Sequence, residues 1–289
     1  MKVLITGAGG QVGRALAATA PAKVEVLRVP SAQLDVTDAS AVRALIVAEQ
    51  PDIIFNAAAY TAVDRAESDE ATALRVNGEA VGILAETAAE TGAKLVHIST
   101  DFVFDGAKSS PYAPDDPTNP LNAYGRTKLA GEQAAGPDAL VVRTAWVYAA
   151  GAANFVQTML RLMAERDEVR VVADQIGTPT YAPSLAQALW GLALAGCHGI
   201  HHFTDSGAAS WYDFAVAIQE EARERGLLHR KATVVPIATK DFPTPATRPS
   251  YSVLDKQATA AALGRNPPHW RDNLRAMLDE LKQDSGVNG

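Results

Sequence analysis

A tyrosine and a lysine four positions apart, Tyr124 and Lys128, form the pattern with the clearest chemistry in the sequence. Residues at this spacing project from one face of a helix, so their side chains would lie next to each other. A free phenol has a pKa of about 10, but a neighbouring ammonium group favours the phenolate and lowers that pKa. Such a tyrosine can donate a proton to a carbonyl oxygen. We therefore predict that Tyr124 and Lys128 are catalytic residues.

A glycine-rich turn follows the first apolar run, 3–5, and carries three glycines at a spacing of three. The first glycine allows a tight turn, the second lets a pyrophosphate approach the backbone, and the third lets the next helix pack on the strand. The start of that helix would offer unpaired N–H groups to phosphate. The segment therefore predicts a dinucleotide-binding turn of the Rossmann type. Its predicted contacts are Gly7, Gly10, Gln11, Val12 and Gly13.

Small and polar residues follow two further apolar runs that are predicted to be strands. Three alanines at positions 57–59 come after the run 52–55, and Thr100 comes after the run 94–98. Open α/β sheets bind their ligands at the carboxyl ends of the strands. We therefore expect the alanines to allow close approach of a cofactor, and Thr100 to lie near Tyr124.

The second predicted strand, 24–27, bears on which ribose the turn would accept. A residue that binds a 2′-hydroxyl group would be acidic and would end this strand, but Arg28 occupies that position. A guanidinium group suits a 2′-phosphate, with Ser31 nearby, although Arg28 could also be a solvated charge at the strand end. Asp35 and Val36 are expected near the adenine. The sequence thus favours NADPH as the cofactor, with NADH as the alternative.

The elements that must position these residues alternate along the first half of the chain. Short apolar runs predict buried strands, and longer segments with helical periodicity lie between them. The predicted strands are 3–5, 24–27, 52–55, 94–98 and 140–143, and the predicted helices are 12–20, 39–49, 69–91 and 123–135. Repeated β-α-β units predict an α/β fold with a Rossmann-type, doubly wound parallel sheet.

The second half is expected to form a smaller C-terminal α/β lobe that binds the substrate. We place the dinucleotide-binding domain at 1–150 and the substrate lobe at 151–289, with a frayed end at 285–289. The apolar strand 169–172 is expected to return to the first sheet. A cleft between the two lobes is the expected ligand site.

Composition excludes several classes of partner. The 26 basic and 33 acidic side chains give a formal charge of -7, and no Lys/Arg cluster suits nucleic acid. A single cysteine, Cys197, excludes an intramolecular disulfide and a Cys-rich metal site. We expect no signal segment, and the sequence contains no apolar run of about 20 residues. We expect a cytoplasmic protein with a small-molecule substrate.

Together these segments resemble the extended short-chain dehydrogenase/reductase superfamily and, within it, the family of dTDP-4-dehydrorhamnose reductases. The resemblance runs from residue 1 to about 281. Besides the turn at 7–13 and the pair at 124 and 128, the matching segments are 56–67, 99–106, 120–125, 143–148, 174–180 and 248–254.

The resemblance implies NADPH-dependent reduction of the 4-keto group of dTDP-4-dehydro-β-L-rhamnose to dTDP-L-rhamnose. Tyr124 would donate the proton, Lys128 would anchor the cofactor and tune Tyr124, and Thr100 would polarise the ketone. The implied cofactor contacts include Ala57, Ala58, Ala59, Tyr60, Thr61, Tyr124 and Lys128. The implied substrate contacts are Val63, Thr100, Asp101, Tyr124, Trp146 and Arg248, the last through the diphosphate.

Two departures from related patterns narrow the expectation. Sugar-nucleotide 4,6-dehydratases carry an Asp-Glu pair after the hydroxyl residue, whereas Phe102 follows Asp101 here, which disfavours elimination. Some relatives are reported to form a Mg²⁺-linked dimer through carboxylates at positions that Ala15 and Pro183 occupy. We therefore expect no metal site, and a monomer or weak homodimer.

Two other functions remain open from the sequence. One is an NAD-dependent sugar-nucleotide epimerase that keeps its cofactor bound. The other is a non-catalytic, cofactor-binding regulatory subunit of the same fold, such as that of methionine adenosyltransferase. The joint presence of Thr100, Tyr124 and Lys128 argues against the non-catalytic function.

Overall fold

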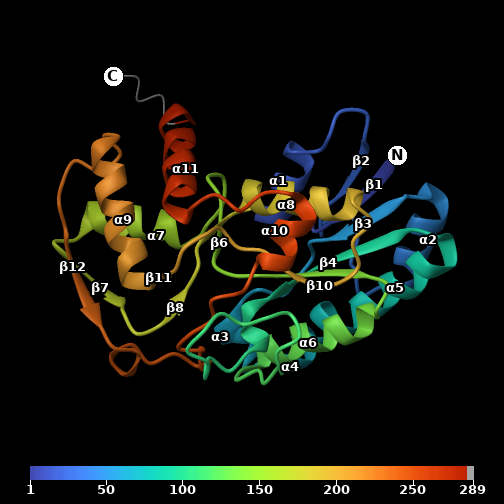
Figure 1. Ribbon diagram of the computed structural model, residues 1–289, viewed down its shortest axis with the longest axis horizontal. Helices are drawn as coiled ribbons and strands as arrows, with labels where there is room; N and C mark the ends of the chain where they lie inside the picture. Colours follow the sequence, from blue (N-terminus) through green and yellow to red (C-terminus); the bar gives the residue numbers. More distant parts are fainter. Residues whose placement is uncertain (285–289) are drawn as a thin grey trace.

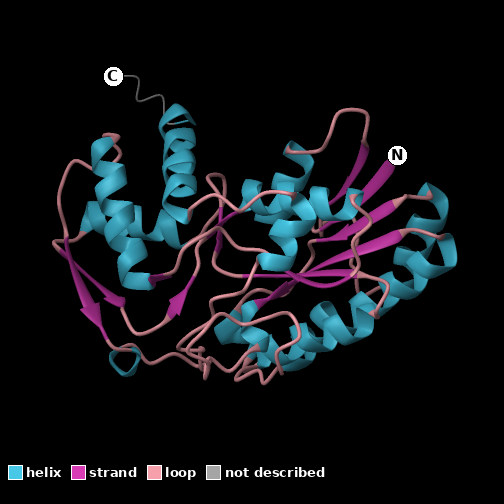
Figure 2. Cartoon of the chain, in the orientation of Figure 1, coloured by secondary structure: helices cyan, strands magenta, loops and turns pink. Residues whose placement is uncertain are grey.

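Six parallel strands form the central sheet of the structure, a computed structural model that describes residues 1–284 (Figures 1 and 2). The frayed end expected at 285–289 lies outside the described residues. In spatial order the strands are β10 (Gly199–His202), β5 (Leu140–Thr144), β4 (Lys94–Thr100), β3 (Ile53–Asn56), β1 (Lys2–Thr6) and β2 (Glu25–Val29). The winding direction therefore reverses between β1 and β3, and a ligand-binding crevice is expected at such a point.

Helices cover both faces of this sheet, which confirms the predicted doubly wound fold (Figure 1). One face carries α1 (Gln11–Ala18) and α8 (Ala182–Leu194), with α10 (Gln257–Leu263) beside α8. The opposite face carries α2 (Ala39–Glu49), α5 (Ala80–Thr91) and α6 (Ala123–Ala135). Side chains such as Leu4, Ile5 and Phe55 are fully buried between these layers. Each stabilises the fold by about 1.5–3 kcal/mol through its removal from water.

The helices begin and end close to the predicted positions because local signals determine them. Asp38 caps α2 by accepting a hydrogen bond from the Ala41 N–H at 3.0 Å. The predicted helix 69–91 is interrupted by a π-helical turn: α4 (Glu70–Leu74), η1 (Arg75–Glu79) and α5 follow one another. Such turns often mark functional sites, and the turn contains Asn77, whose contacts are described below.

The second lobe is built mainly from three helices and a pair of strands, at the left of Figure 1. The helices are α7 (Phe155–Glu165), α9 (Trp211–Glu224) and α11 (Trp270–Asp284), and the strands are β7 (Glu168–Val172) and β12 (Thr233–Ile237). Their apolar faces form a core of their own. A capping box begins α9, because Ser210 and Asp213 hydrogen-bond each other's backbone N–H groups.

Seven short elements complete the described part of the chain. These are α3 (Val63–Ala66), η2 (Asp101–Val103), β6 (Val147–Tyr148), β8 (Ile176–Gly177), β9 (Thr180–Tyr181), β11 (Ala209–Ser210) and η3 (Thr239–Asp241). Within residues 1–284, no helix is long and apolar enough to cross a membrane.

The prediction that the strand at 169–172 returns to the central sheet is wrong. That strand, β7, pairs with β12 in a separate two-stranded sheet, and its Val169 and Val171 side chains pack into the second-lobe core. The sixth strand of the central sheet is instead β10, which contains two histidines and does not read as an apolar run. Residues 182–202 of the predicted second lobe thus return to the first lobe as α8 and β10.

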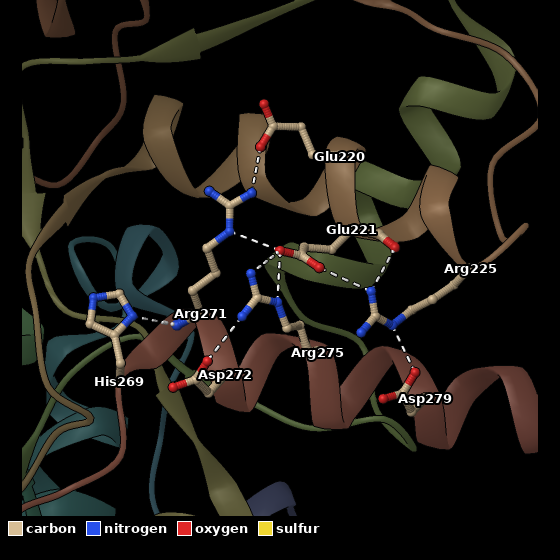
Figure 3. Close-up of polar contacts among 8 residues, drawn as sticks. All are labelled: Glu220, Glu221, Arg225, His269, Arg271, Asp272, Arg275 and Asp279. Carbon is tan, nitrogen blue, oxygen red and sulfur yellow. Dashed lines mark hydrogen bonds and ion pairs between the residues drawn. The ribbon is translucent and has the colours of Figure 1, made fainter.

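An ion cluster joins α9 to α11 around one buried carboxylate, Glu221 (Figure 3). The Glu221 side chain is 3% exposed and receives hydrogen bonds from Arg225, Arg271 and Arg275 at 2.8–2.9 Å. These three bonds lower the pKa of Glu221 to about 2 against the opposing effect of burial. The cluster therefore ties the last described helix to the second lobe.

Replacing Glu221 with glutamine is expected to lower the free energy of unfolding by about 2 kcal/mol at neutral pH, a value discounted because two of the guanidinium groups are partly in water. The contribution of a carboxylate with a lowered pKa is present above its unfolded pKa of about 4.5 and is lost as the pH falls towards about 2. Denaturant unfolding between these pH values should therefore show a shallower loss of stability in Glu221→Gln. Glu220→Gln is the matched control, because Glu220 is 52% exposed and pairs with Arg271, which is itself 36% exposed; equal effects of the two substitutions would contradict the prediction.

Candidate active site

A cleft of about 620 Å³ lies at the carboxyl ends of β1, β3, β4 and β5, between the two lobes. It contains the reversal point of the sheet, as expected for a ligand site. Most of the predicted site residues line it. These are Gly10, Gln11, Val12, Ala57, Ala58, Ala59, Thr61, Val63, Thr100, Asp101, Tyr124, Lys128, Trp146 and Arg248.

The glycine turn closes the floor of the cleft by packing against the loop after β3. Gly7 has φ +61°, and a Cβ atom there would lie 2.5 Å from the Ala58 nitrogen. A Cβ atom on Gly13 would lie 2.5 Å from the Gly7 carbonyl oxygen, so Gly13 lets α1 pack on the turn. Gly10 precedes α1 and provides no side-chain cap, which leaves the first N–H groups of the helix unpaired by a side chain. This arrangement suits a phosphate group.

The start of α6 presses Tyr124 against the end of β4. Asn122 caps the helix by accepting a hydrogen bond from the Gly125 N–H at 2.8 Å. A Cβ atom on Gly125 would lie 2.2 Å from the Phe102 carbonyl oxygen, so only glycine allows this approach. The rings of Phe102 and Tyr124 meet edge to face, with centroids 5.8 Å apart. The Tyr124 phenol is thereby placed beside the residues that follow β4.

Thr100 and Asp101 form the polar contact beside this phenol. The Thr100 hydroxyl accepts a hydrogen bond from the Phe102 N–H at 3.2 Å and donates one to Asp101 Oδ1 at 3.0 Å. Burial raises the pKa of Asp101 to about 6. Burial also raises the pKa of Tyr124 to about 12; the hydrogen bond between Tyr124 and Thr100 lowers this pKa, and the charge of Asp101 raises it. In the structure Tyr124 therefore holds its proton at neutral pH, as a proton donor should.

Lys128 lies deeper than Tyr124 on the same face of α6 and is 2% exposed. Its Nζ atom donates to the Ile98 carbonyl oxygen at 2.6 Å and lies 3.3 Å from His97 Nε2. Burial lowers the pKa of Lys128 to about 8, and the charge of Glu132 opposes this effect. The sequence predicted that Lys128 lowers the pKa of Tyr124. In the structure, burial has the largest effect on this pKa and raises it.

Two stacked tryptophans form the wall of the cleft that faces the second lobe. Trp146 lies after β5 with φ +49°, and Trp211 begins α9. Their rings are parallel within 9°, with centroids 3.5 Å apart. A Cβ atom on Gly177 would lie 2.7 Å from the Trp146 ring, so glycine makes room for the stack. Both rings line the cleft.

Arg248 lies at the mouth of the cleft, where it is held by an acidic residue of the first lobe. Its two terminal nitrogens donate to the two carboxylate oxygens of Asp64, at 3.1 and 2.8 Å. These bonds lower the pKa of Asp64. Arg248 and Trp211 also line a second cavity of about 630 Å³ in the second lobe, so the two hollows share one wall.

Six predicted residues do not line the cleft. Gly7 and Gly13 shape the turn behind it. Arg28 and Asp35 are exposed, with the Asp35 carboxylate bonded to Thr37, and Val36 is 8% exposed in the core below α2. The Tyr60 N–H donates to Asn77 Oδ1 at 2.8 Å, and its hydroxyl contacts Asp69. Their roles towards a cofactor remain predictions.

Sequence reasoning missed several residues that hold the site together. Asn77 lies in the π-helical turn and binds both the backbone of Tyr60 and the hydroxyl of Thr127. Asn56 and His97 form a buried chain of hydrogen bonds to Lys128. Asp64, Trp211 and this chain become visible only when separate segments meet in space, although the interruption of the apolar pattern by His97 within β4 was a local signal.

The two positions considered for a bridging metal offer no carboxylate. Ala15 packs in the core beneath α1, and Pro183 lies in the first turn of α8. No group of three or more His, Cys, Asp or Glu side chains suited to a metal ion occurs in the described part of the chain. The expectation of a metal-independent protein stays a prediction.

Comparison with known proteins agrees with this geometry. The model of the family described as RmlD substrate binding domain matches residues 1–283. The dTDP-4-dehydrorhamnose reductase of Burkholderia thailandensis is 45% identical, and the alignment covers 94% of this chain and 96% of that protein.

Two solved structures extend the likeness to three dimensions. A dTDP-4-dehydrorhamnose reductase from Clostridium acetobutylicum has a TM-score of 0.92 at 39% identity, covering 98% of this chain and 100% of that one. The Bacillus anthracis reductase, solved in complex with NADP, has a TM-score of 0.90 at 35% identity, covering 96% and 99% of the two chains. On the combined basis of family model, sequence identity and shared fold, the chain belongs to the dTDP-4-dehydrorhamnose reductase family.

Proposed function

We propose that the chain reduces the 4-keto group of dTDP-4-dehydro-β-L-rhamnose with NADPH and releases dTDP-L-rhamnose. The observation that carries the proposal is the meeting of Thr100, Tyr124 and Lys128 with the glycine turn in one cleft. The curated relative and the NADP complex named above support the same substrate and cofactor.

The residues of the cleft fit a dinucleotide. Gly10 and the uncapped start of α1 would hold the pyrophosphate, and Lys128 would bind ribose hydroxyls. Arg28 would favour the 2′-phosphate of NADPH over NADH. When bound, NADPH supplies a hydride to the carbonyl carbon.

Tyr124 would supply the proton that completes the reduction. Its pKa of about 12 keeps the phenol protonated until charge develops on the carbonyl oxygen. The Thr100 hydroxyl, which lies beside the phenol, would turn its one hydrogen from Asp101 to the same oxygen. Because a donor to this oxygen is worth most when the oxygen is charged, both groups would act mainly in the transition state.

The opposite wall would bind the sugar nucleotide. Trp146 and Val63 offer apolar contact to the sugar, and Asp101 offers a hydrogen bond. Arg248 would bind the diphosphate, which would take the place of the Asp64 carboxylate on the guanidinium group. Phe102 stands where a second carboxylate would be needed for elimination.

We also propose a cytoplasmic protein that acts as a monomer or weak homodimer without metal or nucleic acid. The residues at the two bridging positions, Ala15 and Pro183, support the absence of a metal-linked dimer.

The test is a stoichiometric assay with purified protein. dTDP-4-dehydro-β-L-rhamnose made in situ should consume NADPH and yield equal amounts of oxidised cofactor and dTDP-L-rhamnose. A reductase releases oxidised cofactor after every turnover, whereas an epimerase retains it. Absence of NADPH consumption, or product formation without it, would overturn the proposal.

A further inference from the structure

A chain of four buried side chains runs from the glycine turn to Lys128. The Thr6 hydroxyl lies 2.8 Å from Asn56 Oδ1, Asn56 Nδ2 lies 3.1 Å from His97 Nδ1, and His97 Nε2 lies 3.3 Å from Lys128 Nζ. Each of the four residues is at most 2% exposed. These hydrogen bonds are therefore largely shielded from bulk water, and the surrounding fold determines which group in each bond is the donor.

The main-chain N–H of Ala58 fixes that polarity. It donates to Asn56 Oδ1 at 3.2 Å, so the other end of the amide, Nδ2, faces His97 and donates to Nδ1. A neutral imidazole that accepts at Nδ1 carries its proton on Nε2. His97 is neutral, because its complete burial lowers its pKa well below the usual value. Consequently an N–H group points from His97 at Lys128.

This N–H group opposes an ammonium on Lys128. An ammonium has three hydrogens and no lone pair, whereas a neutral amine can accept a hydrogen bond. Among the described contacts of Nζ the Ile98 carbonyl oxygen is the one acceptor, and His97 presents a donor. The Ala58 N–H cannot change its protonation state, whereas Lys128 can. The fixed direction of these hydrogen bonds therefore favours loss of a proton from Lys128.

The other charged and titratable groups around Lys128 do not cancel the effect of the His97 N–H group on its ammonium. Along α6, Glu132 favours the ammonium, but its two carboxylate oxygens are engaged by Arg143 of β5. Tyr124 of the same helix is neutral, and Asp101 of η2 is bonded to Thr100. On β4 the neighbour is His97 itself.

We propose that Asn56 and His97 are positioning residues that destabilise the ammonium of Lys128 in the free protein, so that at alkaline pH the lysine takes up a proton when cofactor binds. The inference rests on the cofactor site of the proposed function. Ribose hydroxyls would add the acceptors that the ammonium lacks in the free protein, and the cofactor phosphates would favour its charge. Cofactor affinity must then weaken at alkaline pH, where this proton is harder to obtain.

The test measures the dissociation constant of NADPH by its fluorescence between about pH 7.5 and 9.5. The wild-type constant should rise about tenfold over this range. His97→Gln can turn an amide oxygen towards Lys128, and Asn56→Asp reverses the polarity, because its carboxylate accepts from Nδ1–H and leaves Nε2 as an acceptor. In both variants Lys128 should stay protonated in the free protein. Their NADPH dissociation constants should therefore rise by less than about threefold over the same pH range. The matched control is Thr6→Val, which leaves the Ala58 lock in place and should follow the wild type.

The outcomes separate this inference from the proposed function. No saturable NADPH binding at about pH 7.5 would overturn the cofactor site and the inference with it. Binding that does not weaken with pH in the wild type would overturn the inference alone. So would a wild-type pH dependence that either folded variant retains. Two independent substitutions keep the test decisive if one of them prevents folding.

Discussion

Replacing Tyr124 with phenylalanine is expected to lower turnover by about two to four orders of magnitude, the range found when a general acid is removed. The substitution deletes one hydroxyl group and keeps the ring. The edge-to-face contact with Phe102 therefore remains, as does the close packing of Gly125 on the Phe102 carbonyl. Because Lys128 and the glycine turn are unchanged, NADPH affinity should change by less than about threefold.

The measurement is NADPH oxidation with dTDP-4-dehydro-β-L-rhamnose, together with the dissociation constant of NADPH. Tyr212→Phe is a suitable control, since Tyr212 lies in the second-lobe core and should give nearly wild-type turnover. Retention of more than about a tenth of the turnover in Tyr124→Phe would show that another group donates the proton. An equal loss of NADPH affinity would instead indicate a role in binding.

The sequence predicted the parts of the site that lie next to chain-local signals. The glycine turn follows β1 directly, and Tyr124 and Lys128 share one helix face, so spacing alone placed them together. Thr100 ends β4 and the alanines at 57–59 follow β3, and the carboxyl ends of parallel strands meet at one edge.

The same local signals could not predict which strand completes the central sheet. Both β7 and β10 can complete a parallel sheet, and the apolar run of β7 favoured it. The structure gives β7 a partner in β12 and places β10 beside β5. The buried His202 of β10 is accommodated because Tyr112 and Arg143 provide its hydrogen-bond partners. Those partners lie 90 and 59 positions away in the sequence, respectively, where no local pattern links them.

The pairing of Arg248 with Asp64 shows the same limit at the site. Each residue could be recognised as charged and near a motif, but the sequence did not indicate that they face each other across the mouth of the cleft. A separation of 184 positions carries no periodicity. The sequence therefore identified Arg248 as an anion-binding residue, but not Asp64, whose carboxylate competes with the anion for the guanidinium group.

Replacing Glu132 with glutamine is expected to lower the free energy of unfolding by about 3–5 kcal/mol, because it leaves a buried guanidinium group without its counter-charge. Glu132 of α6 and Arg143 of β5 have side chains only 3% and 2% exposed. Arg143 donates to both carboxylate oxygens at 2.9 and 2.7 Å, and Ser99 donates to one of them at 2.5 Å. The pair attaches the catalytic helix to the sheet two turns beyond Tyr124.

An exposed pair that joins α6 to α4 provides the matched control. Arg126 meets Glu70 with the same two-bond geometry at 2.9 and 2.9 Å, but both side chains are 45% exposed. Glu70→Gln should therefore cost less than about 1 kcal/mol in denaturant unfolding. If both substitutions cost the same, burial is not the cause of the Glu132 effect.

The double substitution Glu132→Leu with Arg143→Met separates the charge from the packing. Removing one member leaves a charge in the core, whereas removing both leaves no charge to solvate. The double variant should therefore be more stable than Glu132→Gln by about 2 kcal/mol or more. A double variant no more stable than the single one would mean that the fixed geometry of the pair, and its bonds to Ser99 and the Pro114 carbonyl, stabilise the helix more than the cancelled charge does. The distinction matters for catalysis, because a helix attached by geometry should lose its alignment at Tyr124 in either variant, whereas a helix attached by charge balance should recover turnover together with stability.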